Sequence, residues 1–211
     1  KNDLGDGAAA VVAAAKQNGN IKTLCGIEEG KTKVDFSQRS LKAPDAVLLS
    51  FDLEFNRALK SAKLGGNNIG DRGTTALSEA IKSNSTLEEL ELPGNKIGAA
   101  GAQSLANMLP FSGALNSLDL CHNDLGEVSE TMAQAVLQHP TMEVFCNIPM
   151  KKMREDSLAE LDLSGKGIGA HGAMVIASLL EFSRALTSLN LFNNQIGAGG
   201  AKAIADSLPQ S

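Results

Sequence analysis

The sequence contains neither tryptophan nor tyrosine, and its seven phenylalanines make up its whole aromatic content of 3%. A core without large rings must be filled with aliphatic side chains, which suits thin and regular layers. No apolar run approaches the roughly 20 residues that a membrane-spanning helix needs. Positive charge is also scarce, since the formal net charge is −5. A nucleic-acid-binding protein normally shows clustered Lys and Arg, so we predict no nucleic-acid partner and no membrane span.

Cysteine is rare as well, with only Cys25, Cys121 and Cys146 at wide spacing. The chain has no Cys-x-x-Cys pair and no cysteine–histidine spacing typical of a metal site, so we predict neither a metal nor a cofactor. Separated cysteines of odd number are typical of free thiols in a reducing compartment, which favours a cytoplasmic location. On neighbouring strands, Cys121 and Cys146 would be staggered by about two residues, which disfavours a disulfide.

The sequence shows no arrangement of a nucleophile and a base. Cys121 and His122 are adjacent, but adjacent residues on a strand point to opposite faces. The glycine-rich turns at 65–66 and 199–200 lack the Lys-Ser/Thr pair of a phosphate-binding loop. We therefore predict that the protein is not an enzyme.

What the sequence does contain is an internal repeat. The pattern Leu-x-x-Leu-x-Leu-x-x-Asn-x-Ile recurs, with small variations, at 87–97, 115–125, 158–168 and 186–196, and weaker copies occupy 59–69 and 34–41. The residues at the third Leu of the pattern lie 28 positions apart within two groups. The first group is Phe36, Leu64, Leu92 and Leu120, and the second is Leu163 and Leu191. The step between the two groups is 43 residues.

Each copy predicts one strand and one helix. The Leu-x-Leu alternation is typical of a strand with one buried face, and the apolar residues that follow it, such as Ala102, Leu105 and Leu109, recur at helical spacing. A single unit cannot bury its apolar face alone, so the units must stack. A helix crosses over between consecutive strands, so the strands should pair in parallel. We predict an α/β fold, a right-handed solenoid or horseshoe over residues 1–211, with a concave parallel sheet and convex helices.

This pattern, followed by Gly-x-x-Gly-Ala, resembles the ribonuclease-inhibitor-like class of leucine-rich repeats. The same class includes the repeat regions of NOD-like receptors and of the GTPase-activating protein for Ran. The resemblance covers nearly the whole chain and implies the fold. It implies little about the partner, because one scaffold carries many binding roles.

The resemblance also implies a structural role for the Asn of the pattern. In that class the Asn side chain bonds backbone groups of neighbouring turns and forms a ladder. The position is held here by Asn67, Asn95, Asn123 and Asn194. Arg39 and Lys166 replace it in two copies, and since neither side chain can accept a hydrogen bond, the ladder should be interrupted there.

Two helix-poor stretches, near 21–33 and 142–157, depart from the regular unit and resemble one another at a constant offset of 121 residues. In each we expect a strand followed by a linker too short for a crossover helix, although 150–154 could form one turn. Two interpretations remain open: these units punctuate a longer super-repeat, or they are decayed ordinary repeats. A missing convex helix would leave a notch in which a partner could dock, or merely a bend.

The outward positions of the strands form the predicted partner-binding surface. It comprises six acidic residues, one cysteine and one aromatic residue, which are Asp35, Glu89, Glu91, Asp119, Glu160, Asp162, Cys146 and Phe192. Charges that face water are ordinarily only solvated; the alternative is that they attract a partner with a basic surface. Without Trp or Tyr anchors, binding should be modest or spread over many contacts.

We therefore predict a non-catalytic protein-interaction or scaffold module that binds a protein through the acidic concave sheet or the notch. The alternative function is regulatory: the repeat region of a nucleotide-switched receptor or of a small-GTPase activator. Because the chain begins and ends inside the pattern, we expect it to be a fragment of a longer array or part of a larger assembly.

Overall fold

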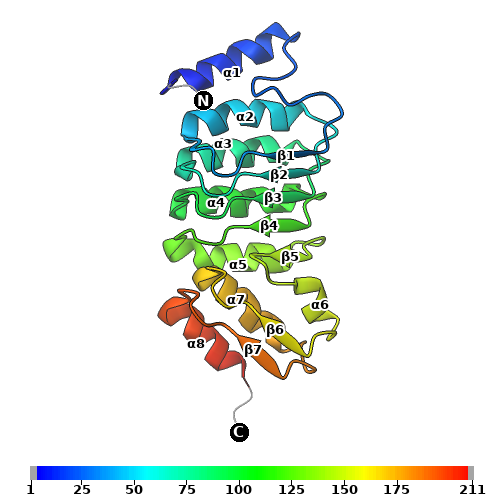
Figure 1. The fold of residues 1–211 in the computed structure, drawn as a ribbon, viewed down its shortest axis with the longest axis vertical. Helices are drawn as coiled ribbons and strands as arrows, with labels where there is room; N and C mark the ends of the chain where they lie inside the picture. The colour runs from blue at the N-terminus through cyan, green and yellow to red at the C-terminus, as the bar shows by residue number, and fades with distance from the viewer. Residues whose placement is uncertain (1–3, 209–211) are drawn as a thin grey trace.

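The computed structural model describes residues 4–208, in which short parallel strands alternate with helices along the chain (Figure 1). The strands are β1 (Lys33–Asp35), β2 (Ser61–Lys63), β3 (Glu89–Glu91), β4 (Ser117–Asp119), β5 (Val144–Phe145), β6 (Glu160–Asp162) and β7 (Ser188–Asn190). The α-helices are α1 (Gly7–Asn18), α2 (Ala43–Phe55), α3 (Gly70–Lys82), α4 (Ala99–Met108), α5 (Ser129–Gln138), α6 (Met150–Arg154), α7 (Gly169–Leu180) and α8 (Gly197–Ser207). Single 3₁₀ turns, η1 (Leu109–Phe111) and η2 (Gly126–Val128), adjoin α4 and α5. None of the helices between residues 4 and 208 is long and apolar enough to span a bilayer.

The strands form two sheets. β1 to β5 pair in chain order, and β6 pairs with β7 alone. Every one of these pairings is parallel, and the register follows the sequence period: Leu90 lies opposite Leu118, and Leu161 lies opposite Leu189. The predicted α/β solenoid of strand–helix units is therefore confirmed. The sheet divides at the single 43-residue step, and Figure 1 shows β6 and β7 inclined to the first five strands.

One apolar core runs through both sheets. The inward residues of the strands and of the turns that follow them, such as Leu90, Leu92, Leu118 and Leu120, are completely buried. Burying one leucine stabilises the fold by roughly 1.5–3 kcal/mol relative to leaving it exposed. Because every unit repeats this contribution, the stack is stable although its strands are only two or three residues long.

Glycines allow the neighbouring helices to approach closely. A Cβ atom added to Gly73 of α3 would lie 2.9 Å from the Cβ of Ala46 in α2, and one added to Gly200 of α8 would lie 2.7 Å from the Cβ of Ala173 in α7. Carbon atoms ordinarily pack at about 3.5–4.0 Å, so no larger residue fits without moving the helices apart. The repeated glycine thus serves helix-to-helix packing.

The Asn side chains of the repeat link each turn to the preceding one. The Oδ1 atom of Asn123 accepts hydrogen bonds from the backbone N–H groups of Asn95 (2.9 Å) and Ile97 (3.0 Å), and its Nδ2 donates to the carbonyl of Leu92 (2.9 Å). Asn67, Asn95 and Asn194 make bonds of the same kind. At Lys166 the link is made by the backbone instead, because the N–H of His122 donates to the carbonyl of Gly167 (2.8 Å).

The irregular unit after β5 turns back on itself. Phe145 and Ile148 exchange two backbone hydrogen bonds, with N–O distances of 3.1 and 2.8 Å. The two residues between them, Cys146 and Asn147, both have positive φ (48° and 63°), as in a type I′ turn. One turn of helix, α6, follows, and its buried Met150 attaches the segment to the core.

The helix layer continues across residues 146–159, between β5 and β6, where the sheet divides; this segment is called the joint. α5 packs directly against α7, although no full crossover helix lies between them in the chain. An open slot would expose the apolar stripes of both helices, including Val136 and Ile176, which are fully buried. Of the two outcomes left open, a notch or a bend, the contact between α5 and α7 leaves no gap as wide as a helix between them, and the irregularity appears as the division of the sheet.

The first irregular unit contains no strand, although a strand around 21–27 was predicted. Residues 19–32 form a loop between α1 and β1 that is held by Asp52 of α2, a carboxylate only 1% exposed. Asp52 accepts hydrogen bonds from the backbone N–H groups of Leu24 (2.6 Å) and Cys25 (3.2 Å), and from the hydroxyl of Thr23. These bonds satisfy groups that a strand would have paired with β1. A cavity of about 680 Å³ remains between this loop and the first regular unit.

A buried histidine lies beside the joint, and from it we predict a pH dependence of stability. His171 of α7 is 1% exposed, its ring lies edge-on to that of Phe145, and its Nε2 has no hydrogen-bond partner. Burial lowers the pKa of His171 from 6.5 to about 4, against a smaller opposing effect of Asp124. The unfolded chain then binds a proton between these pH values that the folded chain does not. Stability is fully present above pH 6.5 and falls as the pH drops towards 4, by about 3 kcal/mol for this group.

Urea unfolding followed by circular dichroism at a series of pH values measures this effect. His139, whose pKa burial also lowers, contributes with the same sign, so the comparison with a His171→Leu variant isolates His171. The free energy of unfolding of the variant should depend less steeply on pH in this window. Parallel curves for the two proteins would show that His171 is protonated as easily in the folded state as in the unfolded one.

Candidate functional site

The outward side chains of β1 to β7, on the side opposite the helices, are called the strand face below. Alternation along each strand places them there: in β3, for example, Leu90 is fully buried while Glu89 and Glu91 are half-exposed. Of the predicted acidic residues, Asp35, Glu160 and Asp162 are exposed. Asp119 of β4 is half-exposed like the two glutamates of β3. All six therefore lie on the strand face.

A lysine lies among these carboxylates. Lys63 of β2 forms an ion pair with Glu91 at 2.5 Å and a longer one with Glu89 at 4.0 Å. The hydrogen bond to Glu91 raises the pKa of Lys63, and a hydrogen bond from the hydroxyl of Ser61 lowers the pKa of Glu89. Both shifts favour the charged forms of Lys63 and Glu89, and Lys63 offsets part of the negative charge of β3.

The aspartates at the strand ends also stabilise the turns that follow. Asp35, Asp119 and Asp162 each accept a hydrogen bond from the backbone N–H two residues later, at 2.8–2.9 Å, and Asn190 does the same in β7. These bonds and those from the hydroxyls of Ser37 and Ser164 lower the pKa of Asp35 and Asp162. A side chain that accepts from its own backbone in this way favours a turn, whether or not anything binds to it.

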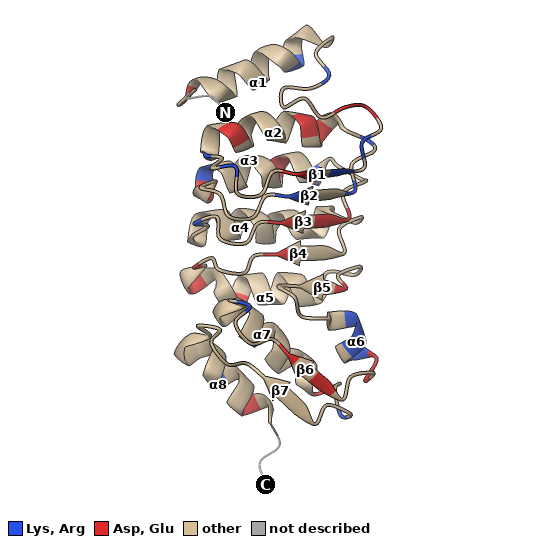
Figure 2. Cartoon of the chain, in the orientation of Figure 1, with Lys and Arg blue, Asp and Glu red and all other residues tan. Residues whose placement is uncertain are grey.

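The acidic surface is interrupted at the joint. Figure 2 shows acidic residues on β1, β3, β4 and β6, with basic residues on β2 and on α6 beside β5. Lys151, Lys152 and Arg154 of α6 are exposed, and Lys151 forms an ion pair with Glu143 at 2.8 Å. The sequence signal for this basic patch was the run 151–154, which the predicted site left out. The strand face thus has two acidic parts, on β1–β4 and on β6.

Phe192 is the most exposed large apolar side chain, at 79%, and it lies two residues after the end of β7. Its backbone N–H is bound by Asn190, so the ring projects from a fixed turn. Transfer of a ring of this size from water into a partner's surface is a strong local contribution to binding. The carbonyl of Phe192 accepts a hydrogen bond from the N–H of Gly165 in the turn after β6, so the exposed ring lies beside the acidic part on β6.

Cys146 does not belong to this surface. The prediction placed it among the outward residues, but the turn that it forms with Asn147 directs its side chain inward, and Cys146 is 0% exposed. Its Sγ atom lies near Cys121, which is 1% exposed. The Sγ atoms of both cysteines and a carboxylate oxygen of Asp119 all lie within 4.8 Å of one another. Within the part of the chain that the structure describes, this trio is the one cluster whose donors could hold a metal ion.

The helix side has a hollow of its own. A groove of about 710 Å³ crosses α7, and residues of α5 and α8, such as Gln134 and Lys202, line its walls. Its lining mixes small, acidic and basic side chains with two half-buried apolar ones, Leu137 and Met174. The strand face, which concentrates one sign of charge and an exposed ring, is the stronger candidate for partner binding.

Comparisons with known proteins agree with this architecture. A sequence model of the family described as "Leucine Rich repeat" matches residues 55–78, 83–106 and 182–205. No curated protein sequence matches the chain. Among solved structures, the chain is similar to one titled "Leiomodin-1 Actin-Binding Site 2 (ABS2)", with a TM-score of 0.55 and 18% sequence identity, over 87% of this chain and 90% of that one. Identity at this level shows a shared fold alone.

Proposed function

We propose that this leucine-rich-repeat solenoid is a non-catalytic module that binds a protein partner with a basic surface through its strand face. The observation that carries the proposal is the row of outward carboxylates on β1, β3, β4 and β6, beside the exposed ring of Phe192. Stacked repeats present such a sheet as one extended surface, which suits a partner that makes many modest contacts.

Electrostatics supports this choice of partner. Summed over the six acidic residues and the two outward lysines, Lys33 and Lys63, the strand face carries a net charge of −4. Complementary charge mainly accelerates encounter and selects among partners, and salt weakens it. The turns hold Asp35, Asp119 and Asp162, and Lys63 holds Glu91. These four carboxylates are therefore ordered before a partner arrives, which limits the entropy lost on binding.

The test removes the charge and preserves the turns. Asp→Asn keeps the oxygen that accepts from the backbone, and Glu→Gln keeps the side-chain length. The variant carries these changes at the six acidic positions of the strand face: Asp35, Glu89, Glu91, Asp119, Glu160 and Asp162. Its formal net charge becomes −5 + 6 = +1. A partner is first captured from cell extract with the unmodified chain, and its binding is then measured by surface plasmon resonance at two salt concentrations.

A matched control neutralises six exposed carboxylates away from the strands, which are Glu79, Glu127, Glu130, Glu155, Glu181 and Asp206. It has the same net charge as the first variant. We expect the strand-face variant to bind at least about tenfold more weakly, mainly through slower association, and to lose most of its salt dependence. The control should bind nearly as the unmodified chain does. Equal binding by both variants would show that the partner does not use the strand face.

A further inference from the structure

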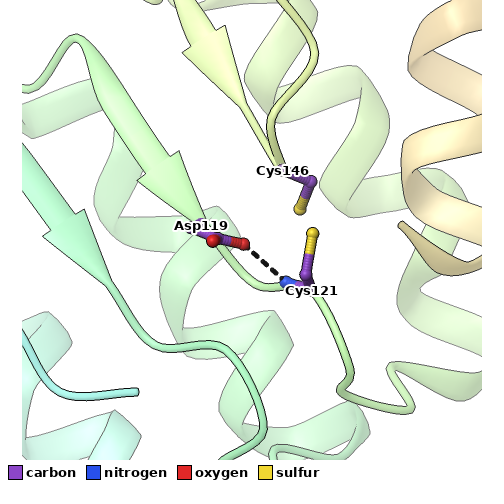
Figure 3. A group of neighbouring side chains, drawn as sticks. All are labelled: Asp119, Cys121 and Cys146. Carbon is purple, nitrogen blue, oxygen red and sulfur yellow. Dashed lines mark hydrogen bonds between the residues drawn. The ribbon is translucent and has the colours of Figure 1, made fainter. Parts of the chain in front are cut away.

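The cluster of Asp119, Cys121 and Cys146 lies at the point where the sheet divides (Figure 3). Asp119 ends β4, Cys121 lies in the turn after β4, and Cys146 lies in the turn after β5. Figure 3 shows the two sulfur atoms pointing towards one another, with the Asp119 carboxylate beside Cys121. Three donors from two separate segments thus converge within 4.8 Å.

The sulfur of Cys146 occupies a position that a backbone carbonyl holds in the regular units. The N–H of Leu64 donates to the carbonyl of Glu91, and the N–H of Leu92 donates to that of Asp119, both at 2.8 Å. The equivalent N–H of Leu120 donates to Sγ of Cys146 at 3.3 Å. The reverse turn at Cys146 and Asn147 removes the next strand's carbonyl from this place and brings a thiol in.

Both sulfurs accept N–H donors. Sγ of Cys121 accepts from Nδ2 of Asn147 at 3.4 Å, as Sγ of Cys146 does from Leu120. An N–H group that donates to sulfur favours its negatively charged form. In metal sites, hydrogen bonds of this kind also orient the ligand side chains. A bound cation displaces the thiol protons and supplies positive charge beside the two buried sulfurs.

We propose that Asp119, Cys121 and Cys146 form a binding site for Zn²⁺. Two thiolates and a carboxylate are donors that zinc uses, whereas Mg²⁺ and Ca²⁺ prefer oxygen alone and Cu⁺ prefers sulfur alone. Zn–S and Zn–O bonds of about 2.3 and 2.0–2.2 Å imply donors roughly 3.4–3.8 Å apart around a tetrahedral ion. The donors therefore need to draw together by about 1.4 Å at most, since they already lie within 4.8 Å of one another. Water supplies the fourth ligand from the half-exposed side of Asp119.

Such an ion ties the end of β4 to the turn after β5, and so strengthens the joint. The site is independent of the strand-face proposal, apart from the carboxylate of Asp119 that both include. Cys25 provides the matched control. It lies beside Asp52 in the first irregular unit, and burial raises its pKa to about 12.

The test titrates the reduced, metal-free protein with Co²⁺, whose thiolate complexes absorb in the near ultraviolet, and then displaces Co²⁺ with Zn²⁺. We expect one ion per chain, tighter binding at higher pH, and a higher unfolding temperature with Zn²⁺. The Cys25→Ser variant should behave like the unmodified chain. Cys121→Ser and Cys146→Ser should each lose more affinity than the roughly 10–100-fold that loss of an outer partner costs, and Asp119→Asn should lose less than either.

The unmodified protein alone can overturn the proposal, so the result does not depend on whether the serine variants fold. A folded, reduced chain that shows no thiolate–Co²⁺ absorption with stoichiometric or excess ion has no such site. Binding that persists unchanged in both Cys121→Ser and Cys146→Ser, or that is lost in Cys25→Ser, would also overturn it.

Discussion

Replacing Phe145 with alanine is expected to lower the free energy of unfolding by about 3–5 kcal/mol. Phe145 is completely buried in β5, its ring packs against that of His171, and its backbone closes the reverse turn with Ile148. Truncation removes one of the large buried side chains that attach the irregular unit to the core, next to Ile148 and Met150, and leaves a cavity there. Urea unfolding at pH 7, followed by circular dichroism, measures the change.

Phe111 provides the matched control, since it is 65% exposed in η1. The same truncation there should change the free energy of unfolding by no more than about 0.5 kcal/mol. If Phe145→Ala were as mild as Phe111→Ala, the unit around β5 would be loosely attached, and the two sheets could not share one core. A milder cost for Phe145→Leu, which leaves a smaller cavity, would support the packing explanation further.

Replacing Asn67 with alanine is expected to cost about 3 kcal/mol or more, because one side chain serves several buried backbone groups. Its Oδ1 accepts from the N–H groups of Arg39 (3.0 Å) and Leu41 (2.9 Å), and its Nδ2 donates to the carbonyls of Phe36 (2.9 Å) and Leu64 (2.7 Å). Asn67 is only 3% exposed, so water cannot readily replace these bonds. The unfolding midpoint in urea is the measurement.

An Asn on the surface separates this effect from the loss of any amide. Asn107 is exposed on α4, where it accepts one hydrogen bond from Gln103, so Asn107→Ala should change stability by less than about 0.5 kcal/mol. A stability for Asn67→Ala within that range would show that the ladder contributes little. The carbonyls and N–H groups of the turns would then have to find other partners.

The candidate site was predictable in part. Alternation along a strand decides which side chains face outward, so Glu89, Glu91 and Glu160 could be placed from the sequence. The same rule failed at Cys146, because the rule holds only while the chain stays extended. Two residues with positive φ end β5 there, and the thiol turns inward towards Cys121. Nothing in the 24 residues between the two cysteines marks this approach.

The strand predicted around 21–27 is absent for a related reason. Local patterns around 21–27 and 142–148 are alike, yet the first is a loop and the second contains a strand and a turn. The difference lies in distant partners: a buried carboxylate, Asp52, accepts the backbone N–H groups of the first. Around the second, α5 and α7 close together and bury their apolar stripes.

The sequence by itself determined the repeating unit, the parallel pairing at a 28-residue register and the inward leucines, because these follow from a period that every copy enforces on its neighbours. Only the tertiary structure decided what happens where that period breaks: the division of the sheet, the closed helix layer and the convergence of Asp119, Cys121 and Cys146. At such a break, no neighbouring copy imposes a register. The conformation is then chosen by which arrangement buries the exposed apolar surface and satisfies the free backbone groups, and those contacts join residues far apart in the chain.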